Sequence, residues 1–253
     1  MAAKHALLLL LLLFFQGCTA EERSITVFAA SSLREAFSEV AQRFEEERGV
    51  KVELNFAGSN TLRLQIEQGG KAEVFASASE EHMRALVERG LVRQAVPFAG
   101  NRLVLVVPAS NPAGIKSVQD LAEKELRLVL ANEAVPAGKY AREALYELEA
   151  SYGEGFAERV LSHAVSSEDS VRGVLAKVAL GEADAGFVYY TDALAAGERV
   201  RVIELPQVRV RPRYYAGVLA SAEHSEAAEA FIAFLLSPEG RQILKKHGFE
   251  VVG

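Results

Sequence analysis

The sequence is poor in the residues that build several common kinds of site. Its 253 residues include 1 Cys, which excludes both a disulfide framework and a site built from several thiolates. Only 7 Pro and a 50% hydrophobic composition exclude a disordered or collagen-like chain. Acidic residues outnumber basic ones, with 34 Asp and Glu against 28 Lys and Arg, and the net charge is -6. We therefore expect no nucleic acid partner, since phosphate binding needs clustered cations.

Histidine is too scattered to indicate a metal or catalytic centre. No two of the five His residues form a His-x-x-x-His pair. They are His5, His82, His163, His224 and His247. Ser31, Ser32 and Ser59 are candidate nucleophiles, but no Gly-x-Ser-x-Gly motif surrounds them. We expect no enzyme activity and no cofactor.

The N-terminal segment has the composition of a secretory signal. One cation, Lys4, precedes the ten apolar residues 6–15, a run about half as long as a membrane-spanning helix needs. A small residue and Cys18 follow, which resembles the lipid-attachment site of bacterial lipoproteins. We predict a signal peptide over residues 1–17, a lipidated Cys18 and a tether over residues 18–24; an ordinary signal peptide with an incidental Cys is the alternative. Either way, the protein would act outside the cytoplasm, and lipidation would anchor it to a membrane.

From residue 25 onward, short apolar runs alternate with amphipathic segments. Residues 25–28 are apolar, and residues 33–44 repeat apolar side chains at helical spacing. Ser32 and Glu35 fit the capping box that begins such a helix, and Gly49 is suited to end it. Further strands are expected at residues 50–56, 74–78, 103–107, 126–130, 185–189, 200–205 and 214–219. Further helices are expected at residues 62–69, 80–89, 117–122, 140–148, 171–180, 225–236 and 238–247.

This alternation predicts an α/β fold with helices on both faces of parallel sheets. No repeat or Pro-rich linker separates two autonomous halves of the sequence. We therefore predict two lobes, each a mostly parallel sheet, joined by crossing segments near residues 101–103 and 206–213. One lobe would comprise residues 25–101 plus 212–253, and the other residues 102–211.

Serine residues stand at two turns from a strand into a helix. Ser31 and Ser32 precede the first predicted helix, and Ser59 precedes the second. A helix N-terminus presents unpaired N–H groups and the positive end of the helix dipole, so it can bind an anion. Residues 134–138 and 167–170 lead into two later helices. These Ser residues would equally serve as ordinary helix caps, so both roles stay open at this point.

Four segments, in this order, resemble the periplasmic molybdate-binding proteins of bacterial ATP-binding-cassette importers. They are ITVFAASSL, NFAGSNTLRLQIEQGGKAEVFASA, VPAGKYAREAL and SSEDSVRGVLAKVALGEADAGFVYYTDA, and the resemblance extends from about residue 25 to 249. It implies a two-lobed periplasmic-binding-protein-like fold. It also implies that a tetrahedral oxyanion, molybdate or tungstate, lies between the lobes. Hydroxyl and backbone N–H groups would hold the ion without a cationic side chain or a direct metal ligand.

The resemblance also implies which residues contact the ion. By motif, the hydroxyl donors are Ser32, Ser59 and Tyr189, and the backbone donors are Ala137 and Val171. The protein would deliver the ion, as a monomer, to the membrane permease of an importer. A rigid ring of donors sized for molybdate and tungstate would leave the bonds to the smaller sulfate stretched. It would also reject phosphate, whose protonated form needs an acceptor.

Two positions depart from the family pattern. Gly58 stands where Ser is common, which removes none of the implied donors. Tyr190 follows Tyr189 and leaves open which phenol faces the ligand; we favour Tyr189 because it directly follows residues 186–188, as in the family. Arg172 follows one of the backbone donors, and we expect its side chain to point away, since successive helix residues diverge by about 100°.

Paired tyrosines leave a second interpretation open. The pairs are Tyr189-Tyr190 and Tyr214-Tyr215. Ferric-ion-binding proteins of iron importers share the two-lobed architecture and use paired Tyr phenolates, and Glu168 or Asp169 would supply a carboxylate. A ferric-ion-binding protein is therefore the alternative function.

Overall fold

The computed structural model describes residues 24–206 and 208–252. The predicted signal peptide, Cys18 and the tether up to residue 23 lie outside the described residues. Ser24, predicted as the last tether residue, instead begins strand β1 (Ser24–Ala30) and pairs with Lys51. No helix within the described ranges is long and apolar enough to span a bilayer.

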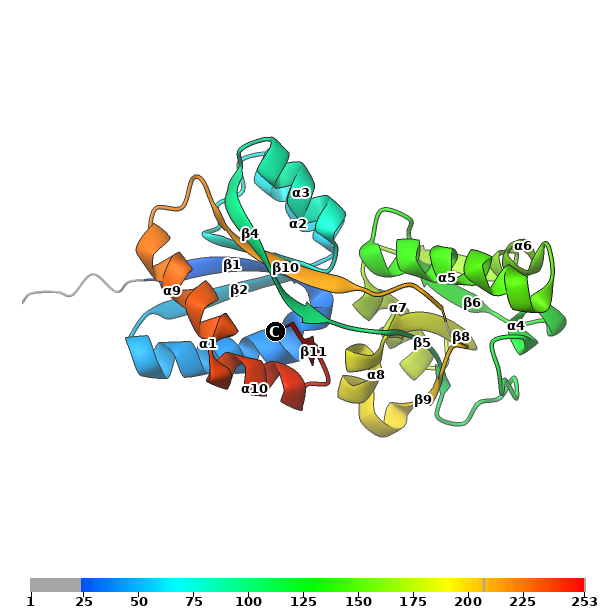
Figure 1. The fold of residues 1–253 in the computed structure, drawn as a ribbon. Helices are drawn as coiled ribbons and strands as arrows, with labels where there is room; N and C mark the ends of the chain where they lie inside the picture. The colour runs from blue at the N-terminus through cyan, green and yellow to red at the C-terminus, as the bar shows by residue number, and fades with distance from the viewer. Residues whose placement is uncertain (1–23, 207, 253) are drawn as a thin grey trace, which may run out of the picture.

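The described chain forms two sheets flanked by helices, which confirms the predicted α/β fold with two lobes (Figure 1). The first sheet has six strands in the order β11-β4-β10-β3-β1-β2, and the second has five in the order β7-β6-β8-β5-β9. With β1, the first sheet contains β2 (Lys51–Ala57), β3 (Val74–Ser77), β4 (Val92–Gly100), β10 (Arg213–Leu219) and β11 (Glu250–Val251). The second contains β5 (Leu103–Pro108), β6 (Leu128–Ala131), β7 (Ala164–Glu168), β8 (Ala185–Tyr189) and β9 (Val200–Ile203).

Helices divide between the lobes in the same way. The lobe of the six-stranded sheet, called lobe 1 here, carries η1 (Ser31–Leu33), α1 (Arg34–Arg48), α2 (Ser59–Glu67), α3 (Glu80–Glu88), α9 (Ser225–Leu236) and α10 (Pro238–Lys246). Lobe 2 carries α4 (Asp120–Glu123), α5 (Pro136–Tyr152), α6 (Phe156–Leu161), α7 (Val171–Ala179), α8 (Tyr190–Ala196) and η2 (Gly197–Arg199).

The chain crosses between the lobes twice, side by side in Figure 1. Strand β4 leads into β5 through Asn101 and Arg102, and β9 leads toward β10 through residues 204–206 and 208–212. The strands at these crossings make both sheets mixed, whereas mostly parallel sheets were predicted. β10 pairs antiparallel with β3 and β4, and β5 pairs antiparallel with β8 and β9, while β1 to β3 and β6 to β8 keep parallel neighbours.

Local structure departs from the sequence expectations at two helix starts. The predicted capping box of Ser32 and Glu35 does not form, because neither η1 nor α1 has a side-chain cap. The Ser32 hydroxyl bonds to Tyr214 instead, and Glu35 pairs with Arg172. Helix α5 begins at residue 136, earlier than the predicted 140, since Pro is well suited to the first helical turn. The sequence patterns also missed the nine-residue strand β4 and the short or polar elements β7, β11, α6 and α8.

A cluster of aromatic side chains packs between the six-stranded sheet of lobe 1 and helices α1 and α9. The Phe37 ring of α1 lies 5.8 Å from that of Phe98 on β4 and 6.0 Å from that of Phe231 on α9, measured between centroids. Phe44 extends the cluster at 5.4 Å from Phe231. Phe37 is fully buried, so the cluster excludes water where three elements meet. Gly49, with φ of 64°, ends α1 as predicted.

We predict that Phe37→Ala lowers the free energy of unfolding by about 3–5 kcal/mol, because it removes buried contacts and leaves a cavity. Urea denaturation followed by circular dichroism measures this change. Tyr146→Ala is the control, since Tyr146 is 50% exposed and its loss should cost less than about 1 kcal/mol. Equal effects of the two substitutions would contradict this account of the core.

Candidate functional site

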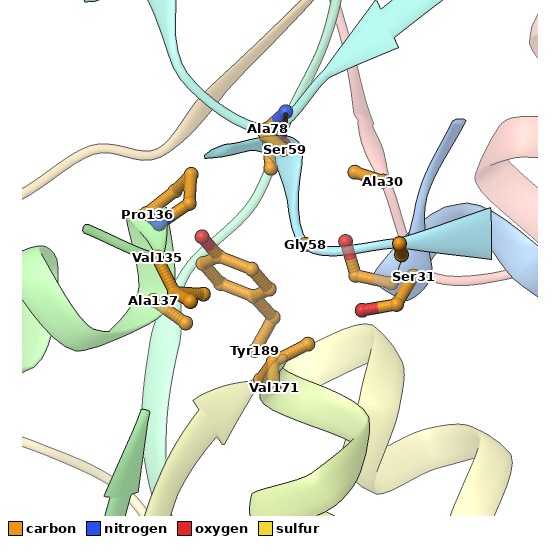
Figure 2. A pocket seen from close by; sticks show the side chains of 12 residues that line it. Ala30, Ser31, Gly58, Ser59, Ala78, Val135, Pro136, Ala137, Val171 and Tyr189 are labelled. Carbon is orange, nitrogen blue, oxygen red and sulfur yellow. Dashed lines mark hydrogen bonds between the residues drawn. The ribbon is translucent and has the colours of Figure 1, made fainter. Parts of the chain in front are cut away.

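The carboxyl ends of β1, β2, β3 and β8 meet at one small hollow between the lobes. The hollow has about 190 Å³ of atom-free space, its open mouth included. Its lining residues are Ala30, Ser31, Ser32, Ala57, Gly58, Ser59, Ala78, Val135, Pro136, Ala137, Val171 and Tyr189. In Figure 2 the Tyr189 ring lies between Ala137 on one side and Ser31 on the other. A hollow at the carboxyl ends of strands is where α/β folds bind ligands.

All five residues implied by the resemblance line this hollow. Lobe 1 supplies Ser32 from η1 and Ser59 from the start of α2. Lobe 2 supplies Ala137 from the first turn of α5, Val171 from the start of α7 and Tyr189 from the end of β8. Ala137 was expected in a loop and lies in a helix instead, which gives its N–H a defined direction. The structure thus brings together side chains and amides from five separate segments.

Helix starts direct backbone donors at the hollow. In α2 the first backbone bond within the helix runs from the N–H of Leu62 to the carbonyl of Gly58, so the amides of the preceding first turn have no partner within the helix. In α5 the first such bond runs from the N–H of Lys139 to the carbonyl of Val135, so the Ala137 amide likewise has no partner within the helix. Val171 is the first residue of α7. These amides can bind the oxygens of an anion.

Three hydroxyl groups complete the donor set. The Ser59 Oγ accepts a hydrogen bond from the Ala78 N–H at 3.0 Å, and the Ser32 Oγ lies 2.9 Å from the Tyr214 hydroxyl. The Tyr189 hydroxyl is buried and has no hydrogen-bond partner among the described residues. A buried polar group without a partner is costly, so this phenol is suited to a ligand.

Burial keeps the phenols in their protonated, donating form. It raises the pKa of Tyr189 well above its ordinary value, and the neighbouring Tyr214 adds to the shift. Burial likewise raises the pKa of Tyr214. Neither phenol ionises near neutral pH, and both retain an O–H to donate.

No charged side chain lines the hollow among the described residues. Arg172, which follows Val171, pairs with Glu35, and its Nε lies 2.9 Å from an oxygen of Asp192. Asp192 is fully buried, and this burial raises its pKa to about 6 although Arg172 opposes the shift. The expectation for Arg172 is confirmed, because its guanidinium is occupied by carboxylates rather than exposed in the hollow.

Contacts join the two lobes next to residues that line the hollow. Lys139 of α5 pairs with Glu81 of α3, and the His82 ring nitrogen Nε2 lies 2.9 Å from the carbonyl oxygen of Ala134. At Gly58 the lobes come so close that an added Cβ would lie 2.5 Å from the carbonyl oxygen of Asp169. Gly58 therefore permits an approach that a residue with a Cβ would obstruct.

The tyrosine pairs do not converge on a cation site. Tyr190 lies outside the hollow, with the Arg102 guanidinium 3.4 Å from its ring centroid. The Tyr215 hydroxyl donates to Glu80, while Tyr214 bonds to Ser32. Across residues 24–206 and 208–252, no three His, Cys, Asp or Glu side chains gather closely enough to hold a metal ion.

The two-lobed fold and the small neutral hollow between its sheets are those of a solute-binding protein. The chain belongs to the family of bacterial extracellular solute-binding proteins, whose model matches residues 25–250. It is 37% identical over 236 residues to the molybdate-binding protein ModA of Mycobacterium tuberculosis (strain H37Rv), which covers 92% of this chain and 87% of that protein.

Solved structures show the same fold. The sulfate-binding protein SubI from M. tuberculosis matches with a TM-score of 0.81 at 23% identity, over 91% of this chain and 87% of that one. The periplasmic molybdate-binding protein of Azotobacter vinelandii matches with a TM-score of 0.79 at 22% identity, over 90% of this chain and 100% of that one. At these identities the likeness concerns the fold alone. Together with the sequence relative, it confirms the resemblance stated from the motifs.

An added methyl group should destabilise the protein to different extents at two glycines of the site. In Gly138→Ala the new Cβ would overlap the backbone carbonyls of Ala131 and Asn132 within the same lobe, so we expect a loss of about 2–3 kcal/mol of unfolding free energy. In Gly58→Ala the new Cβ would overlap the Asp169 carbonyl oxygen of the other lobe and the side-chain Oδ1 of Asn60, both of which can shift, so the loss should stay below about 1 kcal/mol. Urea denaturation compares the two variants, and a larger loss for Gly58→Ala would contradict the assignment of these contacts.

Proposed function

We propose that this protein captures molybdate, and also tungstate, between its lobes through neutral hydrogen-bond donors. The donors are the hydroxyls of Ser32, Ser59 and Tyr189 and the amides of Ala137 and Val171. The observation that carries the proposal is the buried Tyr189 hydroxyl, which lacks a partner and lines a hollow without charged side chains. Support also comes from the sequence relative named as a molybdate-binding protein.

A ring of donors is what a buried dianion requires. A dehydrated dianion is very costly to bury unless each oxygen is hydrogen-bonded, and four oxygens need roughly seven or eight donors. Such bonds are about twice as strong as those between neutral groups, because one partner is charged. Hydrogen phosphate would bind poorly, since its own proton needs an acceptor that this ring lacks. Sulfate would bind poorly for a different reason, because its smaller size would stretch the bonds.

In the cell, the protein would deliver the captured ion to a membrane importer. Lipidation of Cys18 would anchor the protein outside the cytoplasm, with the residues before β1 as a tether. Closure of the lobes around the ion would present a bound form to the membrane permease of an ATP-binding-cassette importer. The ion is the cargo of this process, no cofactor is required, and the protein would act as a monomer.

Isothermal titration with molybdate, tungstate, sulfate and ferric citrate tests the proposal. We expect molybdate and tungstate to bind with similar dissociation constants and sulfate to bind at least about 100-fold more weakly, a difference of about 2.7 kcal/mol. Sulfate binding as tight as molybdate would refute the selectivity by size. Binding of ferric ion alone would overturn the proposal in favour of the iron alternative.

We predict that Tyr189→Phe weakens molybdate binding about 10- to 100-fold, because it removes one hydrogen bond to a charged oxygen. Tyr190→Phe is the matched control, since it removes the same group from the next residue, which lies outside the hollow. Its dissociation constant should stay within about twofold of the unaltered protein. A larger effect of Tyr190→Phe than of Tyr189→Phe would contradict the choice of phenol.

A further inference from the structure

Behind the hollow, a chain of buried hydrogen bonds links the crossing between the lobes to Ser32. The Asn101 Nδ2 lies 3.3 Å from the Tyr214 hydroxyl oxygen, and that oxygen lies 2.9 Å from the Ser32 Oγ. Asn101 is 2% exposed, Tyr214 0% and Ser32 3%, so water does not compete for these groups. We call these three residues the Ser32 relay.

The orientation of the Asn101 amide is defined by its other contacts. Its Oδ1 accepts the N–H of Arg102 at 2.9 Å, so the Nδ2 must face Tyr214 and Thr191, whose Oγ1 it reaches at 2.9 Å. The Nδ2 group is a donor only. The Tyr214 oxygen therefore accepts a hydrogen bond from Asn101.

The direction of the next bond follows from the phenol proton. Among the described residues, the Tyr214 hydroxyl has only Asn101 and Ser32 as hydrogen-bond partners. If Ser32 donated to Tyr214, the buried phenol proton would have no acceptor, at the cost of an unsatisfied polar group. Tyr214 therefore donates to Ser32, and the Ser32 proton is left to point into the hollow.

The hydroxyl of Ser59, the other lobe 1 serine of the donor set, is oriented in the same way by a simpler arrangement. Its Oγ accepts the backbone N–H of Ala78, which again leaves the Ser proton free to donate. A backbone amide supplies the upstream donor there, whereas the Ser32 side depends on the side chains of Tyr214 and Asn101.

We propose that Tyr214, held by Asn101, is a positioning residue that fixes the Ser32 hydroxyl as a donor into the hollow and so favours fully deprotonated oxyanions. Asn101 lies on one crossing segment, and its N–H donates to the carbonyl of Pro212 on the other at 3.0 Å. The Ser32 relay therefore connects the orientation of the Ser32 hydroxyl to the two crossing segments, about which the lobes would move. This inference rests on the proposed oxyanion function and adds a determinant of its selectivity.

Removing the phenol oxygen tests the relay. In Tyr214→Phe the Ser32 hydroxyl loses its upstream donor, so its lone pairs can accept the proton of hydrogen phosphate. We expect molybdate to bind roughly 3- to 10-fold more weakly, and the preference for molybdate over phosphate to fall at least about 3-fold in competition titrations at pH 7. Tyr215→Phe, which removes the same group from the neighbouring residue outside the hollow, should change neither value more than about twofold.

A double-mutant cycle separates positioning from a general structural role. In a Ser32→Ala background, Tyr214→Phe should add less than a twofold change, because the group that it orients is already gone. An equal loss with and without Ser32, or an unchanged phosphate preference in Tyr214→Phe, would overturn the relay. Failure of the unaltered protein to bind any oxyanion would instead overturn the proposed function.

Asn101→Asp gives a second test that keeps the phenol, for use if Tyr214→Phe does not fold. A carboxylate at position 101 would accept a hydrogen bond from the Tyr214 hydroxyl. Ser32 would then have to donate to the phenol oxygen, which turns a lone pair of Ser32 toward the ion. Molybdate binding should then weaken at least as much as in Ser32→Ala. Binding equal to that of the unaltered protein would overturn the relay.

Discussion

The proposed site has to stabilise a buried anion without a counter-charge. The hollow offers hydroxyls and amides, and the guanidinium of Arg172, the residue after Val171, pairs with Glu35 and Asp192. Stabilisation must then come from many oriented dipoles rather than from one cation. That requirement explains why several helix starts meet at one point, and why the orientation of each hydroxyl matters as much as its presence.

The two-lobed architecture meets this requirement by dividing the donors. Ser32 and Ser59 belong to lobe 1, whereas Ala137, Val171 and Tyr189 belong to lobe 2, so a complete ring exists only where the lobes meet. Contacts such as that between His82 and Ala134 join the lobes beside the hollow. Burial lowers the pKa of His82, so this contact does not depend on a protonated ring at neutral pH. Binding and closure would thus be one event.

Much of the fold could be predicted because its signals are local. The apolar spacing of α1 and the left-handed Gly49 at its end can be read within about 16 consecutive residues. The capping box of Ser32 and Glu35 was wrong because both side chains have stronger partners far along the chain, Tyr214 and Arg172. No local pattern contains a contact across 182 residues. Strand β7 was missed because most of its residues are polar or exposed, and β11 because it has two residues.

The candidate site was predicted by resemblance rather than by spacing. Ser at a helix start is ambiguous between a cap and a ligand, and only the family motifs selected Ser32, Ser59, Ala137, Val171 and Tyr189. Their convergence on one hollow needed the tertiary structure. The sequence placed Asn101 near a crossing and Tyr214 in a tyrosine pair, but it did not indicate that they act on Ser32, since that role lies in the direction of hydrogen bonds that only the folded chain defines. The most direct measurement is a crystal structure grown with molybdate, with the ion located by anomalous scattering at the molybdenum edge. We predict one ion ringed by these five residues, with no Lys or Arg head group in contact. An ion bound elsewhere, or one paired with a cationic side chain, would contradict it.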